Sequence, residues 1–254
     1  MGFLNWIKEK IDQGTTRFKE ALHEIKEKAR DFCDRAATRV QMWEEKAKEK
    51  FNELKTKVKE KFRETEVRIR YPNYRPTKPD QDAAKRSKTF LDNKFSRGIK
   101  ETLRDQNSEE RLETVKEVVH NASQILDVKV NDVEYYVPPK ERRNECGYFD
   151  RTDNTLHLNM EMITSDHVEL VQEQIYTVFH ELMHARQWAA VTGKKDYGYP
   201  PETLMEWANN FQNYISPGEG DREYRRQPLE RDAFGFEAII KGKVTVEELL
   251  KYNK

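Results

Sequence analysis

The stretch VELVQEQIYTVFHELMHARQW, residues 168–188, decides the fold of its part of the chain. Its apolar residues recur three or four positions apart, which places them on one face of an α-helix. They are Val168, Val171, Ile175, Val178, Phe179, Leu182 and Ala185. The run Thr-Ser-Asp at 164–166 offers an N-cap, and Gly193 offers a C-cap. The sequence therefore predicts a long amphipathic helix packed on a core.

Two histidines lie at the edge of this apolar stripe. His180 and His184 are separated by one helical turn, so their side chains lie one above the other. Two imidazoles at that spacing can hold one metal ion without bending the backbone. Glu181 lies on the same side of the helix, within reach of a water bound to that ion. The motif H-E-x-x-H, formed here by residues 180–184, also occurs on ordinary surface helices. A third ligand is therefore needed to support a metal site.

A candidate third ligand lies downstream, in residues 224–237. Pro228 suits the first turn of a helix, where its missing N–H costs nothing. Glu230 is followed three residues later by Ala233, and so shares its face with a small side chain. A small residue at this position lets the helix approach the histidine helix closely. Asp232 is the competing candidate, although it points away from the Ala233 face.

Together these motifs resemble the gluzincins, the zinc peptidases whose third metal ligand is a Glu on a later helix. The later motif, P-x-E-x-x-A-x-x-F, is formed here by Pro228, Glu230, Ala233 and Phe236. The resemblance covers roughly residues 128–240. It implies a Zn²⁺ ion held by His180, His184 and Glu230, with Glu230 preferred over Asp232 as the third ligand.

The resemblance also implies an activity. The expected protein is a zinc metallopeptidase in which Glu181 is the general base that activates the metal-bound water, and its substrate is a peptide or protein. Tyr224 is the first candidate for a second catalytic residue, a hydroxyl donor to the oxyanion, because some gluzincins place a Tyr shortly before the ligand Glu. Tyr197 and Tyr199 are the alternatives.

One position departs from the best-known gluzincin pattern. Thermolysin-like enzymes carry an Asp four residues after the ligand Glu, and this Asp orients a zinc-bound His. Phe234 stands at that position here. A metal-bound His normally needs such a partner, so another residue must supply it. Asn209, Asp221 and Glu237 are the candidates.

The rest of the C-terminal part indicates an α+β fold dominated by helices. Two short strands, 146–150 and 155–159, flank a turn, and residues 128–137 form a further strand that ends at two prolines. The resemblance implies a strand at a sheet edge, ahead of the metal helix, to which a peptide can add. The sheet is expected to be small and antiparallel or mixed. Further helices are expected at 82–105, 108–127, 201–214, 221–241 and 246–252.

The first 70 residues form a different kind of segment. Apolar residues recur about every 3.7 positions from Phe3 to Phe62, close to the 11-residue period of 3.67 residues per turn. We expect a long amphipathic helical arm, either continuous or broken near Gly14. Its stripe is expected to pack on itself or on another chain, or to lie on a membrane surface through the apolar tip 3–7. The Pro-rich residues 71–80 are expected to link this arm to a metallopeptidase domain at 81–254.

Composition limits the remaining function classes. The chain has 46 Lys and Arg against 46 Asp and Glu, and residues 1–70 have 19 against 14, which is too weak a basic excess to predict nucleic-acid binding. The two cysteines suggest no disulfide framework. No signal peptide is apparent, so a cytoplasmic location is expected, with export by a dedicated secretion machine left open.

Two other functions compete with a general peptidase. The chain could be a toxin-like effector that cleaves a single protein target, with the arm for docking or delivery. It could also be an inactive zincin fold that binds a partner or a metal. The intact set of His180, Glu181 and His184 argues against the inactive alternative, because such a protein has no need of the general base.

Overall fold

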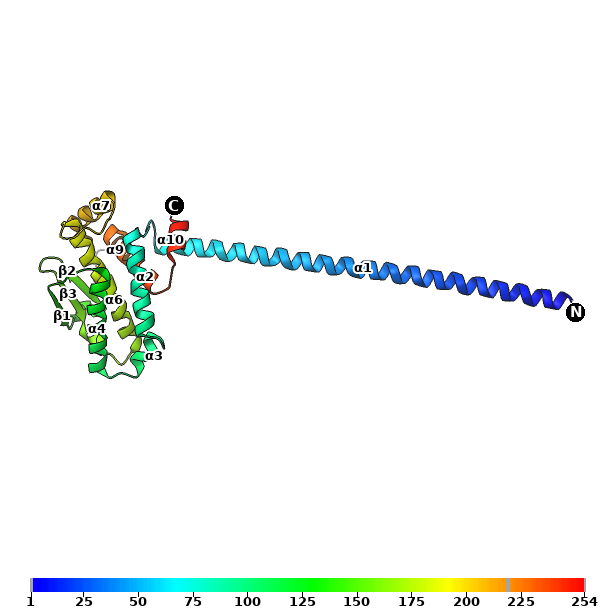
Figure 1. Cartoon of the computed structure of the whole chain (residues 1–254), viewed down its shortest axis with the longest axis horizontal. Coiled ribbons are helices and arrows are strands. Elements are labelled where there is room, and N and C mark those ends of the chain that lie inside the picture. Colours follow the sequence, from blue (N-terminus) through cyan, green and yellow to red (C-terminus); the bar gives the residue numbers. More distant parts are fainter. Residues whose placement is uncertain (1, 218–219, 254) are drawn as a thin grey trace. The chain divides into compact units, whose positions relative to one another are not determined.

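The computed structural model describes residues 2–217 and 220–253, with side chains from residue 19 onward. It is dominated by helices, with a long N-terminal helix and a small mixed sheet, as the sequence predicted. The chain forms two compact units, Met1–Arg63 and Glu64–Lys254, called unit 1 and unit 2 below (Figure 1). No helix in the described part of the chain combines the length and the apolar character needed to cross a membrane.

Unit 1 is formed by most of helix α1, Gly2–Arg70, which continues through Gly14 without a break. Its apolar side chains are exposed along the helix, including Trp43 at 71% and Phe62 at 74% of full exposure. Ion pairs one turn apart, such as Lys28 to Glu24 at 2.6 Å, stabilise the polar faces. The side chains of the apolar tip, residues 3–7, lie outside the described part.

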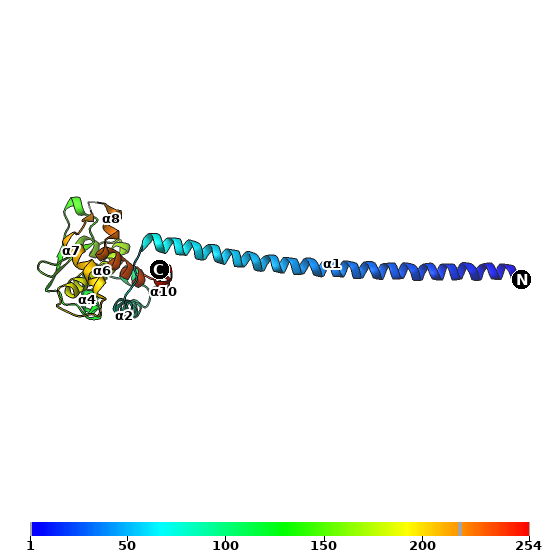
Figure 2. The same cartoon turned by 90° about the horizontal axis from the view of Figure 1, so that it is seen from above.

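Unit 2 is organised around helix α6, Val168–Val191 (Figures 1 and 2). Figure 1 shows α6 running between the sheet and helix α2. The predicted apolar face is buried, and Val171, Ile175 and Val178 are fully inaccessible to solvent. The helix ends at the C-cap Thr192, after which Gly193 adopts a positive φ of 68°. Because α6 contacts most of the other elements of unit 2, it fixes the position of any side chain that it carries.

The N-terminal half of unit 2 differs from the prediction at one place. Residues 82–105 were expected as one helix, but the structure has α2, Lys78–Lys94, and α3, Ile99–Arg104. Gly98, with a φ of 96°, separates them, a conformation that an L side chain rarely adopts. Helix α4, Ser108–Leu126, follows the prediction closely. Its N-cap Asn107 and Glu110 form a capping box, and its buried face packs on α6.

The described residues form one sheet of three strands in the order β1-β3-β2. Strand β1, Asp132–Tyr136, is shorter than the expected 128–137 and pairs in parallel with β3, Thr155–Asn159. Strand β2, Gly147–Asp150, pairs antiparallel with β3 and forms one edge. The short helix η1, Lys140–Arg142, lies in the connection between β1 and β2. The sheet is therefore mixed.

The register of β2 determines which of its backbone groups face the edge. The amide of Asn159 donates to the carbonyl of Cys146 at 3.1 Å, so these two residues form a hydrogen-bonded pair. Hydrogen-bonded pairs alternate along an antiparallel ladder, so Tyr148 and Asp150 also face β3. The backbone groups of Gly147 and Phe149 consequently point away from β3, toward the open edge of the sheet.

The C-terminal helices complete unit 2. They are α5 (Met160–Ile163), α7 (Pro201–Gln212), α8 (Asp221–Arg226), α9 (Pro228–Ile240) and α10 (Val246–Tyr252). The single helix expected at 221–241 is wrong, because Gln227, extended ahead of Pro228 in the first turn of α9, separates α8 from α9.

The last turn of α1 belongs to unit 2. Val67 is fully buried, and the Arg68 side chain donates from Nε to the carbonyl of Tyr252 at 2.9 Å. The side chain of Asn253 donates to the carbonyls of Tyr71 and Tyr74. Tyr74 lies in the core, within the segment that the sequence presented as a linker. These contacts secure residues 67–74 to the C-terminus.

Candidate metal centre

Helix α6 presents its two histidines from one face. His180 and His184 are separated by one helical turn, and their ring centroids are 4.9 Å apart. Both side chains are buried, at 6% and 8% exposure. They lie where the apolar face of α6 meets the first turn of α9, so neither imidazole is on the open surface of the helix.

Helix α9 supplies a carboxylate to the same place. Glu230 is the third residue of α9 and is completely buried. Ala233, three residues later, is also completely buried. The two helices are in contact, as the small side chain at this position predicted.

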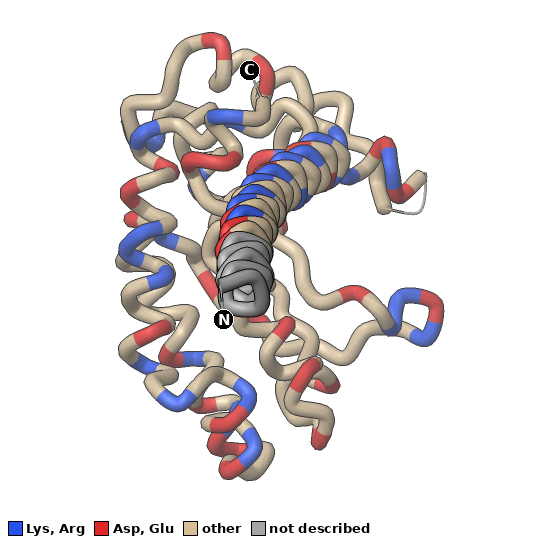
Figure 3. Tube along the Cα trace, turned by 90° about the vertical axis from the view of Figure 1, so that its right-hand side faces the viewer, with Lys and Arg blue, Asp and Glu red and all other residues tan. Residues whose placement is uncertain are grey.

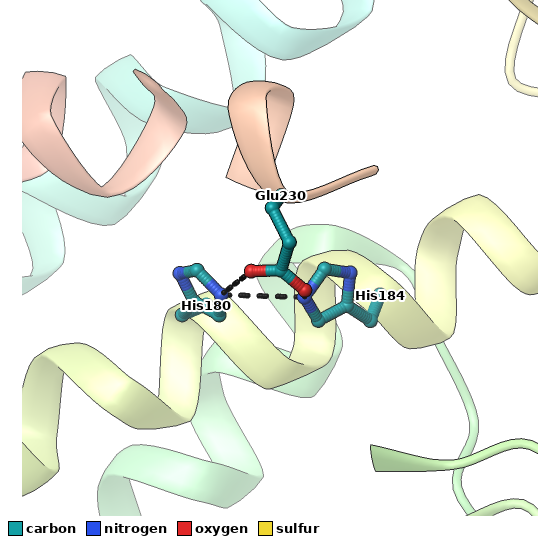
Figure 4. A group of neighbouring side chains, drawn as sticks. All are labelled: His180, His184 and Glu230. Atoms are coloured by element: carbon teal, nitrogen blue, oxygen red, sulfur yellow. Dashed lines mark hydrogen bonds and ion pairs between the residues drawn. The ribbon is translucent and has the colours of Figure 1, made fainter. Parts of the chain in front are cut away.

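The three side chains converge closely (Figure 4). The Nε2 atoms of the two histidines are 3.2 Å apart. The Glu230 carboxylate is 3.2 Å from His180 Nε2 and 3.1 Å from His184 Nε2. Ligands at about 2.0–2.1 Å in a tetrahedron lie roughly 3.3 Å from one another. The donor spacing and the N,N,O donor set therefore fit a divalent metal ion such as zinc. His180, His184 and Glu230 are called the metal group below, because they have the composition of a metal site.

Each histidine is oriented by a second hydrogen bond. His180 Nδ1 lies 2.9 Å from Glu237 Oε2, and His184 Nδ1 lies 2.8 Å from Gln187 Oε1. Protons on the two Nδ1 atoms leave both Nε2 atoms free to bind a metal. Glu237 was one of three candidates for this role. Of the other two, Asp221 forms an ion pair with Arg225 instead.

Gln187 was missed by sequence reasoning, although a local signal existed. It lies three residues after His184 and thus on the same face of α6. Its amide nitrogen donates to the carbonyl of Leu229 at 3.1 Å, so the residue also joins α6 to the start of α9. One side chain therefore orients a histidine and positions the helix that carries Glu230.

His180, His184 and Glu230 shift one another's pKa values through their charges. Burial alone would raise the pKa of Glu230, but the two imidazoles outweigh it and hold that pKa well below its usual value. Burial would likewise lower the pKa of both histidines. The Glu230 carboxylate outweighs burial at each of them, together with Glu237 at His180, and raises both pKa values. Anionic carboxylates are thus held against cationic imidazoles.

Glu181 lies beside this group but is not part of it. Burial raises the pKa of Glu181 to about 7, against the opposing effect of the two histidines. Its carboxylate accepts a hydrogen bond from the backbone N–H of Phe149, on the open edge of β2. The residue that the sequence assigned as general base therefore lies between the metal group and the strand edge.

Two tyrosines approach the group from the α7–α8 side. The Tyr214 hydroxyl donates to Glu230 Oε1 at 2.5 Å. Tyr224, the predicted hydroxyl donor, is hydrogen-bonded to Tyr214, and its ring lies 6.2 Å from that of Phe234. Burial, followed by the charge of Glu230, raises the pKa of both tyrosines, so both hydroxyls keep their protons. Tyr214 was not identified from the sequence.

The alternative candidates lie elsewhere. Asp232 accepts from Trp207 Nε1 at 2.9 Å and pairs with Arg231, so its carboxylate serves a different buried network. Tyr197 donates to the carbonyl of Asp127. Tyr199, the other alternative donor, donates a hydrogen bond to Asp80 Oδ1 at 2.6 Å. None of the three side chains is hydrogen-bonded to the metal group within the described part of the chain.

The metal group opens into a large hollow of about 1850 Å³. Its walls include the edge strand β2, the turn around η1, helix α8 and the start of α9. His180, His184, Glu181 and Glu230 all line it. A molecule in the hollow can therefore reach the metal group, the carboxylate of Glu181 and the open edge of β2 together.

Comparisons with known proteins returned no match to a family model, to a curated protein or to a solved structure. The interpretation of the site therefore depends on its own geometry.

Proposed function

We propose that unit 2 is a zinc-dependent peptidase domain. The observation that carries the proposal is the close approach of His180, His184 and Glu230, with Glu181 next to them at the wall of the hollow. Zinc bound by three protein side chains retains a position for water, acts as a Lewis acid and lowers the pKa of that water to about 7. Two further roles, accepting the proton of water and donating a hydrogen bond to the substrate, fall to side chains of this chain.

In this proposal Glu181 accepts the proton of the attacking water. Its pKa of about 7 suits a group that must accept a proton and release it again near neutral pH. The Phe149 amide holds its carboxylate toward the hollow. Deprotonated Glu181 and the edge of β2 thus lie on the same side of the metal group, where an extended substrate backbone can pair with the strand.

Two tyrosine hydroxyl groups can supply the hydrogen-bond donor that the reaction needs. A peptide carbonyl that is attacked by water develops negative charge, which needs a hydrogen-bond donor. Tyr224 and Tyr214 are protonated, line the hollow and are linked to one another. Tyr214 already donates to Glu230, so Tyr224 is the better candidate for the donor to the substrate.

The test separates catalysis from metal binding. Zinc-loaded full-length protein is incubated with a library of extended peptides, and products are identified by mass spectrometry. Glu181→Gln should retain one zinc per chain but lose cleavage by about 10²–10⁴-fold. Glu169→Gln is the control, since Glu169 is exposed on the same helix, pairs with Lys100 and lies away from the hollow.

Two results would contradict the proposal. Cleavage that persists in Glu181→Gln would eliminate Glu181 as the general base. Zinc-loaded wild-type protein that cleaves neither a library peptide nor a protein of a whole-cell extract would refute the proposal and favour a metal-binding zincin fold without activity. Cleavage of one protein of the extract, with no cleavage of library peptides, would keep the proposal and narrow it to an effector with a single protein target.

We further propose that the arm docks the protein on another helix. Its apolar stripe is exposed over many turns, and long isolated helices obtain most of their stability from packing. Self-association of the full-length chain, measured by sedimentation, is the expected result. Binding to lipid vesicles without self-association would assign the stripe to a membrane surface instead.

A further inference from the structure

The hollow above the metal group is lined by an excess of basic side chains. Eleven of its lining residues are Lys or Arg and eight are Asp or Glu. Three of the eight acids are Glu181, Glu230 and Glu237, which serve the metal group. The rest of the lining therefore has eleven basic residues against five acidic ones, although the chain as a whole has 46 of each.

Many of these cations are already neutralised by neighbours. Arg225 pairs with Asp221, Arg142 pairs with Glu145, and Lys241 lies between two carboxylates. Such pairs stabilise the walls locally and leave little charge for a ligand.

Four other cations are available. Lys140, Arg143, Arg222 and Arg226 are exposed, and none has an ion-pair or hydrogen-bond partner in the described part of the chain. They form two groups, one at η1 and one on α8. Lys and Arg are marked in blue along the trace in Figure 3, and Figure 2 shows η1, in green, and α8 at the same edge of unit 2. These two elements thus carry four unpaired cations, against one lining acid at η1, Glu141, that also has no ion pair in the described part of the chain.

The position of the two groups relates them to the metal centre. The η1 turn leads into β2, whose edge holds Glu181 through Phe149. Helix α8 leads directly into α9, which carries Glu230. A ligand that lies along β2 and over the metal group is thus accompanied by cations on two different walls of the hollow.

The open strand edge identifies the kind of ligand. Gly147 directs its backbone N–H and C=O away from β3, and Phe149 directs its C=O the same way. An extended peptide can pair with these groups as an added strand. A nucleic acid would use only the charges, because its backbone offers no matching ladder of donors and acceptors. We infer that the hollow selects extended peptides with Asp or Glu on both sides of the segment over the metal centre; this rests on the proposed peptidase function for the identity of that segment.

The test is binding, which does not depend on turnover. Full-length, zinc-loaded Glu181→Gln protein is titrated into fluorescein-labelled peptides of equal length that differ only in their flanking residues, which are Asp/Glu, Asn/Gln or Lys/Arg. We expect the acidic peptide to bind about tenfold more tightly than the neutral one at low salt. The preference should weaken between about 0.05 and 0.3 M salt, because the contacts are exposed.

Charge-reversal variants locate the effect. Arg143→Glu with Arg226→Glu removes one cation from each wall and should abolish the preference for the acidic peptide. The matched control is Lys85→Glu with Lys129→Glu, two exposed lysines of unit 2 outside the hollow, with the same change in net charge. This control should keep the preference. Equal loss in both pairs would show that the effect is one of net charge only and would overturn the inference.

Other outcomes are equally informative. Neutral or basic peptides that bind as tightly as the acidic one would refute the inference, as would a single-stranded oligonucleotide that displaces the acidic peptide with higher affinity. Selective binding of acidic peptides, with no cleavage by zinc-loaded wild-type protein, would support the inference and refute the proposed function. Cleavage at a rate that does not depend on the flanking charges would support the proposed function and refute the inference.

Discussion

The replacement of Glu237 tests whether its hydrogen bond to Nδ1 orients His180 for metal binding. The Glu237 carboxylate lies 2.9 Å from His180 Nδ1, on the side of the ring opposite the Nε2 atom that approaches Glu230. Burial would raise its pKa, but His180 and Lys241 outweigh burial and lower it, so the group is an anion. An anion at Nδ1 keeps the proton there and leaves Nε2 as the metal-binding atom.

The expected size of the effect follows from the general cost of losing such a partner. Loss of a partner that orients a metal-bound histidine typically costs 10–100-fold in metal affinity, or about 1.4–2.7 kcal/mol. Glu237→Gln retains a carbonyl that can accept a hydrogen bond from the Nδ1–H and loses only the charge, so we expect about a tenfold loss. Glu237→Ala removes the acceptor as well and leaves the His180 N–H buried without a partner. We expect about a hundredfold loss for that variant.

The assay is competition for zinc between the protein and a fluorescent chelator at fixed pH. Glu173→Gln provides a matched control. Glu173 and Glu237 both pair with Lys241, but only Glu237 contacts His180. Glu173→Gln should therefore bind zinc as the wild type does. Wild-type affinity in Glu237→Ala, or equal losses in Glu173→Gln and Glu237→Gln, would refute the proposed orienting role.

Three further predictions concern the ligands, the pH dependence and the arm. Glu230→Ala should lose bound zinc by metal analysis, whereas Asp232→Asn should retain it even though its fold is destabilised; the opposite pattern would move the third ligand. In the metal-free protein, the raised pKa of His180 means that its protonation stabilises the fold below about pH 6.5. This stabilisation is lost as pH rises through the folded pKa, so the chelated protein should melt at a lower temperature at pH 8.5 than at pH 6, and zinc should reverse the loss. A chain of residues 64–254 should bind zinc as the full chain does but no longer self-associate, whereas a chain that begins at Thr77 loses the buried Val67 and Tyr74 and should be destabilised by several kcal/mol.

The sequence predicted the parts of the site that depend on local geometry. His180 and His184 are brought together by helical periodicity alone. Glu230 was assigned through the resemblance to the gluzincins, on the motif formed with Pro228, Ala233 and Phe236, and the small Ala233 on its face was the local signal. The histidine pair needed only that a helix form, and the apolar stripe at 168–188 strongly favours one. The mixed sheet was expected only in outline, because nothing in the sequence showed that β1 would pair in parallel with β3.

Tyr214 shows why other parts could not be predicted. It lies between α7 and α8, in a segment without apolar periodicity. Its position depends on Gln227, whose amide bonds both the N–H and the C=O of Ile215. Asn210 donates to the same Gln227 side chain at 2.8 Å. These hydrogen bonds connect residues 12 and 17 positions apart, and no local pattern of residue types announces them.

The break between α8 and α9 is a different kind of error. Pro228 was recognised as a residue of a first helical turn, yet the predicted helix began at 221. A proline in a first turn implies that the preceding residue is not helical, and Gln227 is indeed extended. The break frees the Gln227 side chain to hold the Tyr214 segment. The sequence thus already contradicted a helix that runs from 221 through Pro228. It did not show that the break would position Tyr214 beside the metal group.

The departure from the gluzincin pattern at Phe234 changes which residue places a negative charge beside His180. The Phe234 ring centroid lies 4.5 Å from that of His180, so an apolar group occupies the position at which thermolysin-like enzymes carry an Asp. Glu237, three residues later on α9, contacts His180 Nδ1 and shares its charge with Lys241. In the metal-free chain, Glu230 and Glu237 are neutralised by protons on the imidazoles, which is why the pKa of His180 is raised. A divalent ion at the Nε2 atoms would neutralise the same carboxylates in place of those protons. Protons and metal therefore compete for one set of charges, so zinc binding must release protons, and the number released should grow as the pH falls toward 6.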